Sequence, residues 1–134
     1  QLSPQWLGVG NPVDLWPGIS IMGHSRPEME TAALRHVLAD PAVHAAMAVI
    51  SAYDPELGEE HLPMIRGVAR DFPDKPFVYF MYGKHFAEVR RTLESTGTTL
   101  VFPSPERAVR ALMHLKRRAE FLERQEARAR ESLG

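Results

Sequence analysis

The chain has 134 residues, of which 44% are hydrophobic and 25% are charged, and its formal net charge is -1. This length and composition predict one domain with a substantial hydrophobic core. The small net charge provides no field that would attract nucleic acid or an anionic membrane. The absence of cysteine excludes disulfides and thiolate metal sites and suits the reducing cytoplasm, which is the expected location.

The beginning of the chain is rich in glycine and proline. Residues 1–23 are therefore predicted to be irregular, with a short edge strand near Val13–Leu15. They lack a basic start followed by an apolar stretch, so no export signal is predicted, and the opening at Gln1 suggests a piece of a longer polypeptide. Ser25 and Glu28 then have capping-box spacing, and an apolar stripe behind them predicts a helix over 26–38.

The middle of the chain alternates between strand-like and helix-like runs. Two short, continuous apolar runs are typical of strands in a parallel sheet that is covered on both faces. Apolar residues at helical spacing lie between them, with Pro63 expected in the first turn, and a later helix is closed by Gly97. The predicted elements are strands over 45–51, 76–82 and 98–102, and helices over about 62–72 and 86–96.

The final helix has a clear start at Ser104-Pro105-Glu106, which combines a capping side chain, a proline at the first helical position and an acid near the positive end of the helix dipole. A narrow apolar seam runs on from Ala108 to Leu122, and the helix is expected to continue to about Ala129, roughly 40 Å in all. Its distal part should extend beyond the sheet.

This alternation predicts an α/β fold: a three-layer, doubly wound parallel sheet of the flavodoxin-like type with a long C-terminal helix. Residues 24–118 would form the domain, after an irregular segment at 1–23. Residues 119–134 would be a helical extension or linker, and a homo-oligomer formed through this helix is possible.

Ligands of such sheets bind beyond the carboxyl ends of the strands. One connection there, Tyr82-Gly83-Lys84-His85, places a glycine, a cation and an imidazole before a helix, where free N–H groups favour an anion. Gly83, Lys84 and His85 are therefore candidate anion-binding residues. The alternative is that Gly83 only forms a tight turn and Lys84 is merely solvated.

Another such connection, within 53–61, gathers four acids and a histidine, but neighbours entering a helix diverge around its axis, so a solvated loop is expected rather than a metal site. Zinc-ligand spacing, dinucleotide and phosphate-binding loops and a nucleophile elbow do not occur in the sequence. We therefore predict no catalytic residue and no metal ligand.

Four motifs, which occur in this order within residues 10 to 118, resemble one domain of the NDP-forming acyl-CoA synthetases, the relatives of succinyl-CoA synthetase. The motifs are Asn11-Pro12-Val13-Asp14-Leu15, then Leu38-Ala39-Asp40-Pro41-Ala42-Val43, then Lys75-Pro76-Phe77-Val78, and finally Pro103 to Leu112.

The resemblance implies an acid–CoA ligase that works through an acyl phosphate and a phosphohistidine. The chain is similar to the C-terminal domain of the succinyl-CoA synthetase β subunit, which would complete the acyl-substrate pocket. Asn11, Asp14, Gly83 and Lys84 would lie on the edge facing the phosphohistidine domain. CoA and NTP or NDP would be bound by the CoA-binding and ATP-grasp domains, and no cofactor by this one.

The sequence also departs from the family pattern. His24 lacks the sequence context of the phosphohistidine, and Asp54-Pro55-Glu56 replaces a pair of glycines near the substrate. The isolated chain is therefore expected to be inactive. The alternative function is a stand-alone α/β module that binds a partner protein without catalysis.

Overall fold

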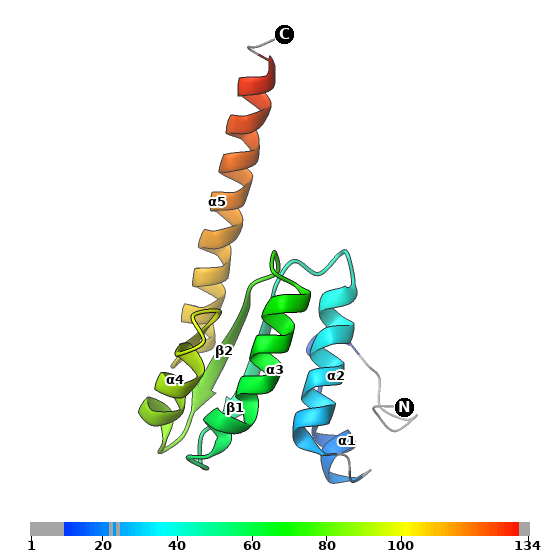
Figure 1. Cartoon of the computed structure of the whole chain (residues 1–134), viewed down its shortest axis with the longest axis vertical. Helices are drawn as coiled ribbons and strands as arrows, with labels where there is room; N and C mark the ends of the chain where they lie inside the picture. Colours follow the sequence, from blue (N-terminus) through cyan, green and yellow to red (C-terminus); the bar gives the residue numbers. More distant parts are fainter. Residues whose placement is uncertain (1–9, 22, 24, 132–134) are drawn as a thin grey trace.

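The computed structural model describes residues 10–21, 23 and 25–131 (Figure 1). Its elements are α1 (Trp16–Ser20), α2 (Arg26–Ala39), β1 (Ala46–Ser51), α3 (Leu57–Asp71), β2 (Phe77–Tyr82), α4 (Phe86–Glu94), β3 (Thr99–Phe102) and α5 (Pro105–Glu131). The predicted α/β class, the parallel sheet and the long C-terminal helix are confirmed. The arrangement is consistent with a flavodoxin-like fold.

The three strands form one parallel sheet in the order β1-β2-β3. Ala46 lies opposite Phe77, and Phe77 lies opposite Thr99. Since β-α-β crossovers are right-handed, the helices that connect consecutive strands, α3 and α4, cover the same face. They pack against each other, and α2 packs beside α3 to complete this layer (Figure 1).

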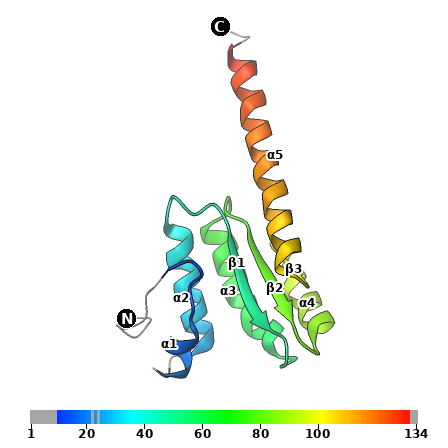
Figure 2. The same cartoon turned by 180° about the vertical axis from the view of Figure 1, so that it is seen from behind.

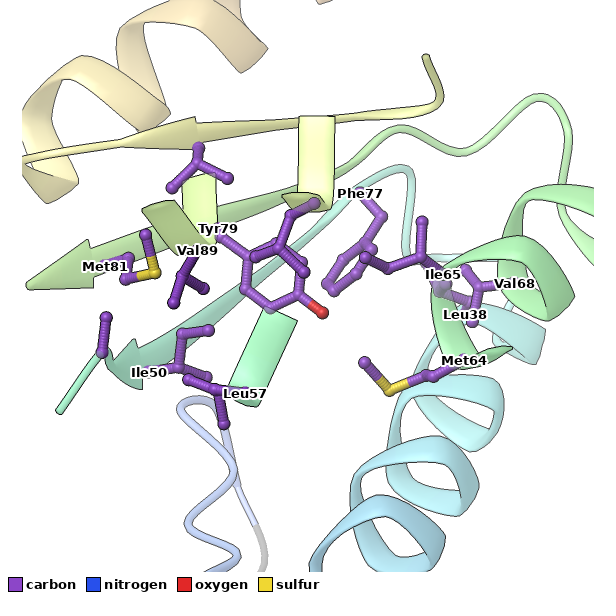
Figure 3. Packing of buried hydrophobic residues seen from close by; sticks show 13 residues of the cluster. Leu38, Ile50, Leu57, Met64, Ile65, Val68, Phe77, Tyr79, Met81 and Val89 are labelled. Carbon is purple, nitrogen blue, oxygen red and sulfur yellow. The ribbon is translucent and has the colours of Figure 1, made fainter. Parts of the chain in front are cut away.

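The core lies between the sheet and the α2–α4 layer. Alternate residues of the strands point into it, as the two-residue period of a strand requires, and the Tyr79 ring lies at its centre (Figure 3). The buried cluster contains Leu38, Ile50, Ala52, Leu57, Met64, Ile65, Val68, Phe77, Tyr79, Met81, Val89, Leu93 and Val101.

The opposite face of the sheet is only partly covered. On this face, helix α5 packs on β2 and β3 through the fully buried Ala108, whereas no described helix covers this face of β1 (Figure 2). We call this surface the open face and define it by four residues: Val49, Phe80, Tyr82 and Leu100. Val49 is 59% exposed and Leu100 is 53% exposed, which is unusual because parallel sheets are generally buried on both faces.

Helix α5 extends well beyond the sheet, as predicted (Figure 1). Leu112 is half-buried, but the next members of the same seam, Leu115 and Leu122, are exposed. The part of the helix that stabilises the domain is therefore its first few turns.

Three local predictions are wrong. Val13–Leu15 is not a strand, because Asp14 accepts a hydrogen bond from the Trp16 N–H (3.0 Å) and Pro17 favours a helix start at α1. Ser25 makes no side-chain cap bond, so the capping box is absent. Pro63 lies inside α3 rather than in its first turn, because the helix already begins at Leu57.

Within the described ranges, none of the helices combines the length and the apolar character that crossing a membrane requires.

Candidate functional site

The connection from β2 to α4 is held against the end of β1 by backbone contacts. The Ala52 N–H donates to the Tyr82 carbonyl (2.6 Å), and the His85 N–H donates to the Ala52 carbonyl (3.0 Å). Gly83 between them has a φ of 128°, and a Cβ there would lie 2.6 Å from the Ala52 oxygen. Only glycine fits this approach, so the position of Lys84 is fixed by the backbone of a neighbouring strand.

The predicted anion-binding residues do lie together here, but their surroundings are mixed. Lys84 is exposed and has no ion-pair partner in the described part of the chain. The His85 N–H is already bonded to Ala52, so it is not available to a ligand. Glu88, in the first turn of α4, places a carboxylate oxygen 3.4 Å from His85 Nδ1, at the helix end that would attract an anion. The Lys84 ammonium is the remaining cationic group of this loop.

An aromatic row, which the sequence analysis did not identify, extends from this edge onto the open face. The rings of Tyr53 and Tyr82 meet edge to face with centroids 6.3 Å apart, and those of Phe80 and Tyr82 lie 5.9 Å apart. Tyr53 is 61% exposed. The signal in the sequence was the alternation of β2, which places Phe80 and Tyr82 on the face opposite Tyr79.

Asn11 and Asp14, the other predicted substrate-facing residues, lie elsewhere. Both are exposed in the segment that leads into α1, and α1 packs beside α2 (Figure 2). Asp14 caps the start of α1. No hydrogen bond or ion pair among the described residues joins either side chain to Gly83 or Lys84. The four predicted substrate-facing residues therefore do not form one site in this structure.

The other two helix starts at this edge are occupied by the protein's own groups. Asp54 accepts a hydrogen bond from the Glu56 N–H (2.9 Å) and so helps to begin α3. At α5, hydrogen bonds from its own backbone N–H and from Ser104 hold the pKa of Glu106 below its usual range. Among residues 10–21, 23 and 25–131, no group of three potential ligands could hold a metal ion. His24 lies outside the described residues.

A second polar cluster is buried between α2, α3 and β2. His61 Nε2 lies 2.6 Å from Glu30 Oε2, and the His61 and Tyr79 rings meet edge to face at 6.0 Å. The predicted solvated loop over 53–61 is wrong for its last residues, because α3 already begins at Leu57 and His61 is buried. Its spacing from Leu57 and Ile65, on the apolar face of α3, was the signal that it is buried.

No family model matches this chain. The curated proteins and the solved structures likewise include none with significant similarity to it.

The carboxyl edge thus offers one exposed cation on a loop held by backbone contacts, a row of aromatic rings beside it, and a helix start that already carries a carboxylate. The buried cluster offers a titratable pair within the helix layer that covers one face of the sheet.

Proposed function

We propose that this chain is a domain of an NDP-forming acyl-CoA synthetase, in which it helps to form the acyl-substrate pocket facing the phosphohistidine domain. Two features support the proposal: the order of the four sequence motifs and the consistency of the fold with a flavodoxin-like domain. The observation that carries it is the Gly83 contact with Ala52, because it fixes Lys84 at the carboxyl edge, where α/β sheets bind ligands.

In this proposal, the Lys84 ammonium neutralises the carboxylate of the acyl substrate or the phosphate of the acyl phosphate. Asn11 and Asp14 would contribute to the same edge only in the assembled enzyme, since they do not contact Lys84 here. CoA and the nucleotide would be bound by the CoA-binding and ATP-grasp domains, and the phosphohistidine would come from a further domain.

The first test is the gene itself. The proposal requires coding sequence for a CoA-binding or ATP-grasp domain next to this one, in the same polypeptide or as an adjacent subunit. The assembled enzyme should form acyl-CoA from a short carboxylic acid, ATP or GTP, and CoA, whereas the isolated chain should form none. A gene without such neighbours would refute the domain assignment.

The second test addresses Lys84. In the assembled enzyme, Lys84→Ala should raise the KM for the acid by up to about fivefold, the factor that corresponds to losing one exposed charge contact of about 1 kcal/mol. Lys116→Ala is the matched control, because Lys116 is an exposed lysine on α5. Equal KM values for the two variants would remove Lys84 from the substrate site while leaving the domain assignment intact.

The second candidate function, a protein-interaction module, is favoured by the open face. Val49, Tyr82 and Leu100 leave apolar surface exposed, and β1 is an edge strand among the described residues. An amphipathic helix of a partner protein would cover the part of this face that α5 leaves open. A partner identified in the native host should then bind the Val49→Lys variant much more weakly than the wild type. It should bind the Arg66→Glu variant as well as the wild type, because Arg66 is an exposed residue of α3, away from the open face. Equal binding to both variants would contradict this function.

A further inference from the structure

The Glu30–His61 pair joins α2 to α3 inside the helix layer, on the face of the sheet away from α5. The His61 side chain is 2% exposed and that of Glu30 is 17% exposed. Burial of a charged pair is costly unless the two charges compensate each other closely. The protonation state of this pair therefore affects how firmly α2 is attached.

The atoms around the His61 ring define how many protons it carries. Nδ1 lies 2.7 Å from the Leu57 carbonyl oxygen, and Nε2 lies 2.6 Å from a carboxylate oxygen of Glu30. Both neighbours are hydrogen-bond acceptors, and a neutral imidazole has only one N–H. Nε2 and Oε2 are within ion-pair distance but are not aligned as a hydrogen bond, and neither has another hydrogen-bond partner among the described residues. A neutral ring that donates Nδ1–H to Leu57 would hold the Nε2 lone pair against the carboxylate, which is repulsive, so the short distance favours His61⁺ beside Glu30⁻.

The remaining groups around the ring come from α2 and β2. Arg26 Nε lies 3.9 Å from the second carboxylate oxygen of Glu30, and the buried Tyr79 hydroxyl has no hydrogen-bond partner among the described residues. Burial lowers the pKa of His61, but the close contact with the Glu30 carboxylate and its charge, together with the Leu57 carbonyl, outweigh this effect. The pKa of His61 is therefore raised above 6.5, even though the charge of Arg26 opposes this.

We propose that His61 and Glu30 form a proton-dependent latch that fastens the first half of α2 to the α3–β2 core and loosens this attachment when His61 loses its proton. A neutral His61 would leave the Glu30 carboxylate without a compensating charge beside it in a largely buried position, which is unfavourable. The Arg35–Asp71 pair between α2 and α3 is exposed and contributes little. The C-terminal end of α2 stays attached in either state, because Leu38 is buried in the core and Lys75 donates to the carbonyls of Leu38 and Asp40.

The direction of the pH effect follows from the raised pKa. Below the unfolded-state value of 6.5, the stabilisation from the proton is fully present. It is lost as the pH rises through the folded-state pKa. The latch is therefore closed in mildly acidic solution and opens on alkalinisation, and helices outside this contact, such as α4, should not respond.

Hydrogen exchange between pH 6 and pH 9, expressed as protection factors, tests the latch. Protection of the α2 amides should fall by up to about tenfold per pH unit between pH 6.5 and the folded-state pKa, because one proton is released on opening in that range. It should level off above the folded-state pKa, while the α4 amides keep their protection throughout. In Glu30→Gln the α2 amides should be less protected at pH 6 and should lose this pH dependence. His114→Gln, which alters an exposed histidine on α5, should behave as the wild type.

Nitrogen-15 chemical shifts of the His61 ring provide a second measurement that needs no variant. At pH 6 they should show two N–H groups and an imidazolium, with a titration midpoint above 6.5. A neutral ring with one N–H at pH 6 would overturn the proposal. So would α2 and α4 protection that changes in parallel, or an undiminished pH dependence in Glu30→Gln.

Discussion

Substitution of Gly83 by alanine should destabilise the protein more than any other single glycine-to-alanine change at the turns of this domain. Its φ of 128° lies in a region that residues with a Cβ rarely adopt, at a cost of about 1 to 3 kcal/mol. The new methyl group would also lie 2.6 Å from the Ala52 carbonyl oxygen, which is backbone and cannot rotate away. Overpacking of this kind adds about 1 to 3 kcal/mol, so we expect a total loss of about 2 to 6 kcal/mol.

Two other glycines separate these contributions. Gly97 has a φ of 69° and nothing within 4 Å of an added Cβ, so Gly97→Ala should cost about 1 to 2 kcal/mol from its dihedral alone. Gly10 also has open space around it and does not have a positive φ, so Gly10→Ala should change stability by less than about 0.5 kcal/mol. The expected order of destabilisation is Gly83, then Gly97, then Gly10.

Urea denaturation of the three variants, followed by circular dichroism, measures this order. The midpoint should shift while the slope stays constant, since each variant retains the same buried surface. A Gly83→Ala variant that is no less stable than Gly97→Ala would show that the loop can move away from Ala52. The rigidity attributed to Lys84 would then have no basis.

Four further substitutions have expected outcomes. Tyr79→Phe should leave stability unchanged or raise it by up to about 1 kcal/mol in thermal unfolding, because it removes a buried hydroxyl that has no described hydrogen-bond partner; a loss above 1 kcal/mol would reveal a partner. Leu112→Ala should cost about 1 to 2 kcal/mol and Leu122→Ala less than about 0.5 kcal/mol, since only the first is half-buried; equal losses would place the distal helix in the core. Lys75→Met should lower the free energy of unfolding by about 1.5 to 3 kcal/mol in urea denaturation, because the ammonium donates to two backbone carbonyls around the end of α2. An unchanged urea midpoint would contradict that role.

The elements that depend on local patterns were predictable from the sequence. The apolar runs at 45–51 and 76–82 became β1 and β2, because short, continuous apolar runs bounded by turn residues are typical of parallel strands. The start of α5 at Pro105 followed from the Ser104 side chain, which accepts a hydrogen bond from the helix backbone. Local prediction failed at Val13–Leu15 and at Pro63, where capping by Asp14 and the earlier start of α3 outweighed the pattern.

Only part of the candidate site could be predicted from local sequence patterns. The position of Lys84 after a strand and before a helix was evident from the sequence, since the glycine before it marks a tight connection. The donor that appeared available, the His85 N–H, is in fact bonded to Ala52 on the neighbouring strand. The pairing of β1 with β2 determines that bond, and no spacing within residues 82–85 encodes it.

The sequence by itself determined most of the helices and strands from α2 onward and which of their faces are apolar, because these properties depend on neighbours within a turn or two. Only the tertiary structure decided which polar atoms meet: His61 with Glu30 across α3 and α2, and the two tyrosines, Tyr53 and Tyr82, at the carboxyl edge. It also decided that β1 remains without a helix on one face. Such contacts join residues far apart in the chain, and their energies depend on burial and on distances of a few ångströms, which exist only once the elements have packed.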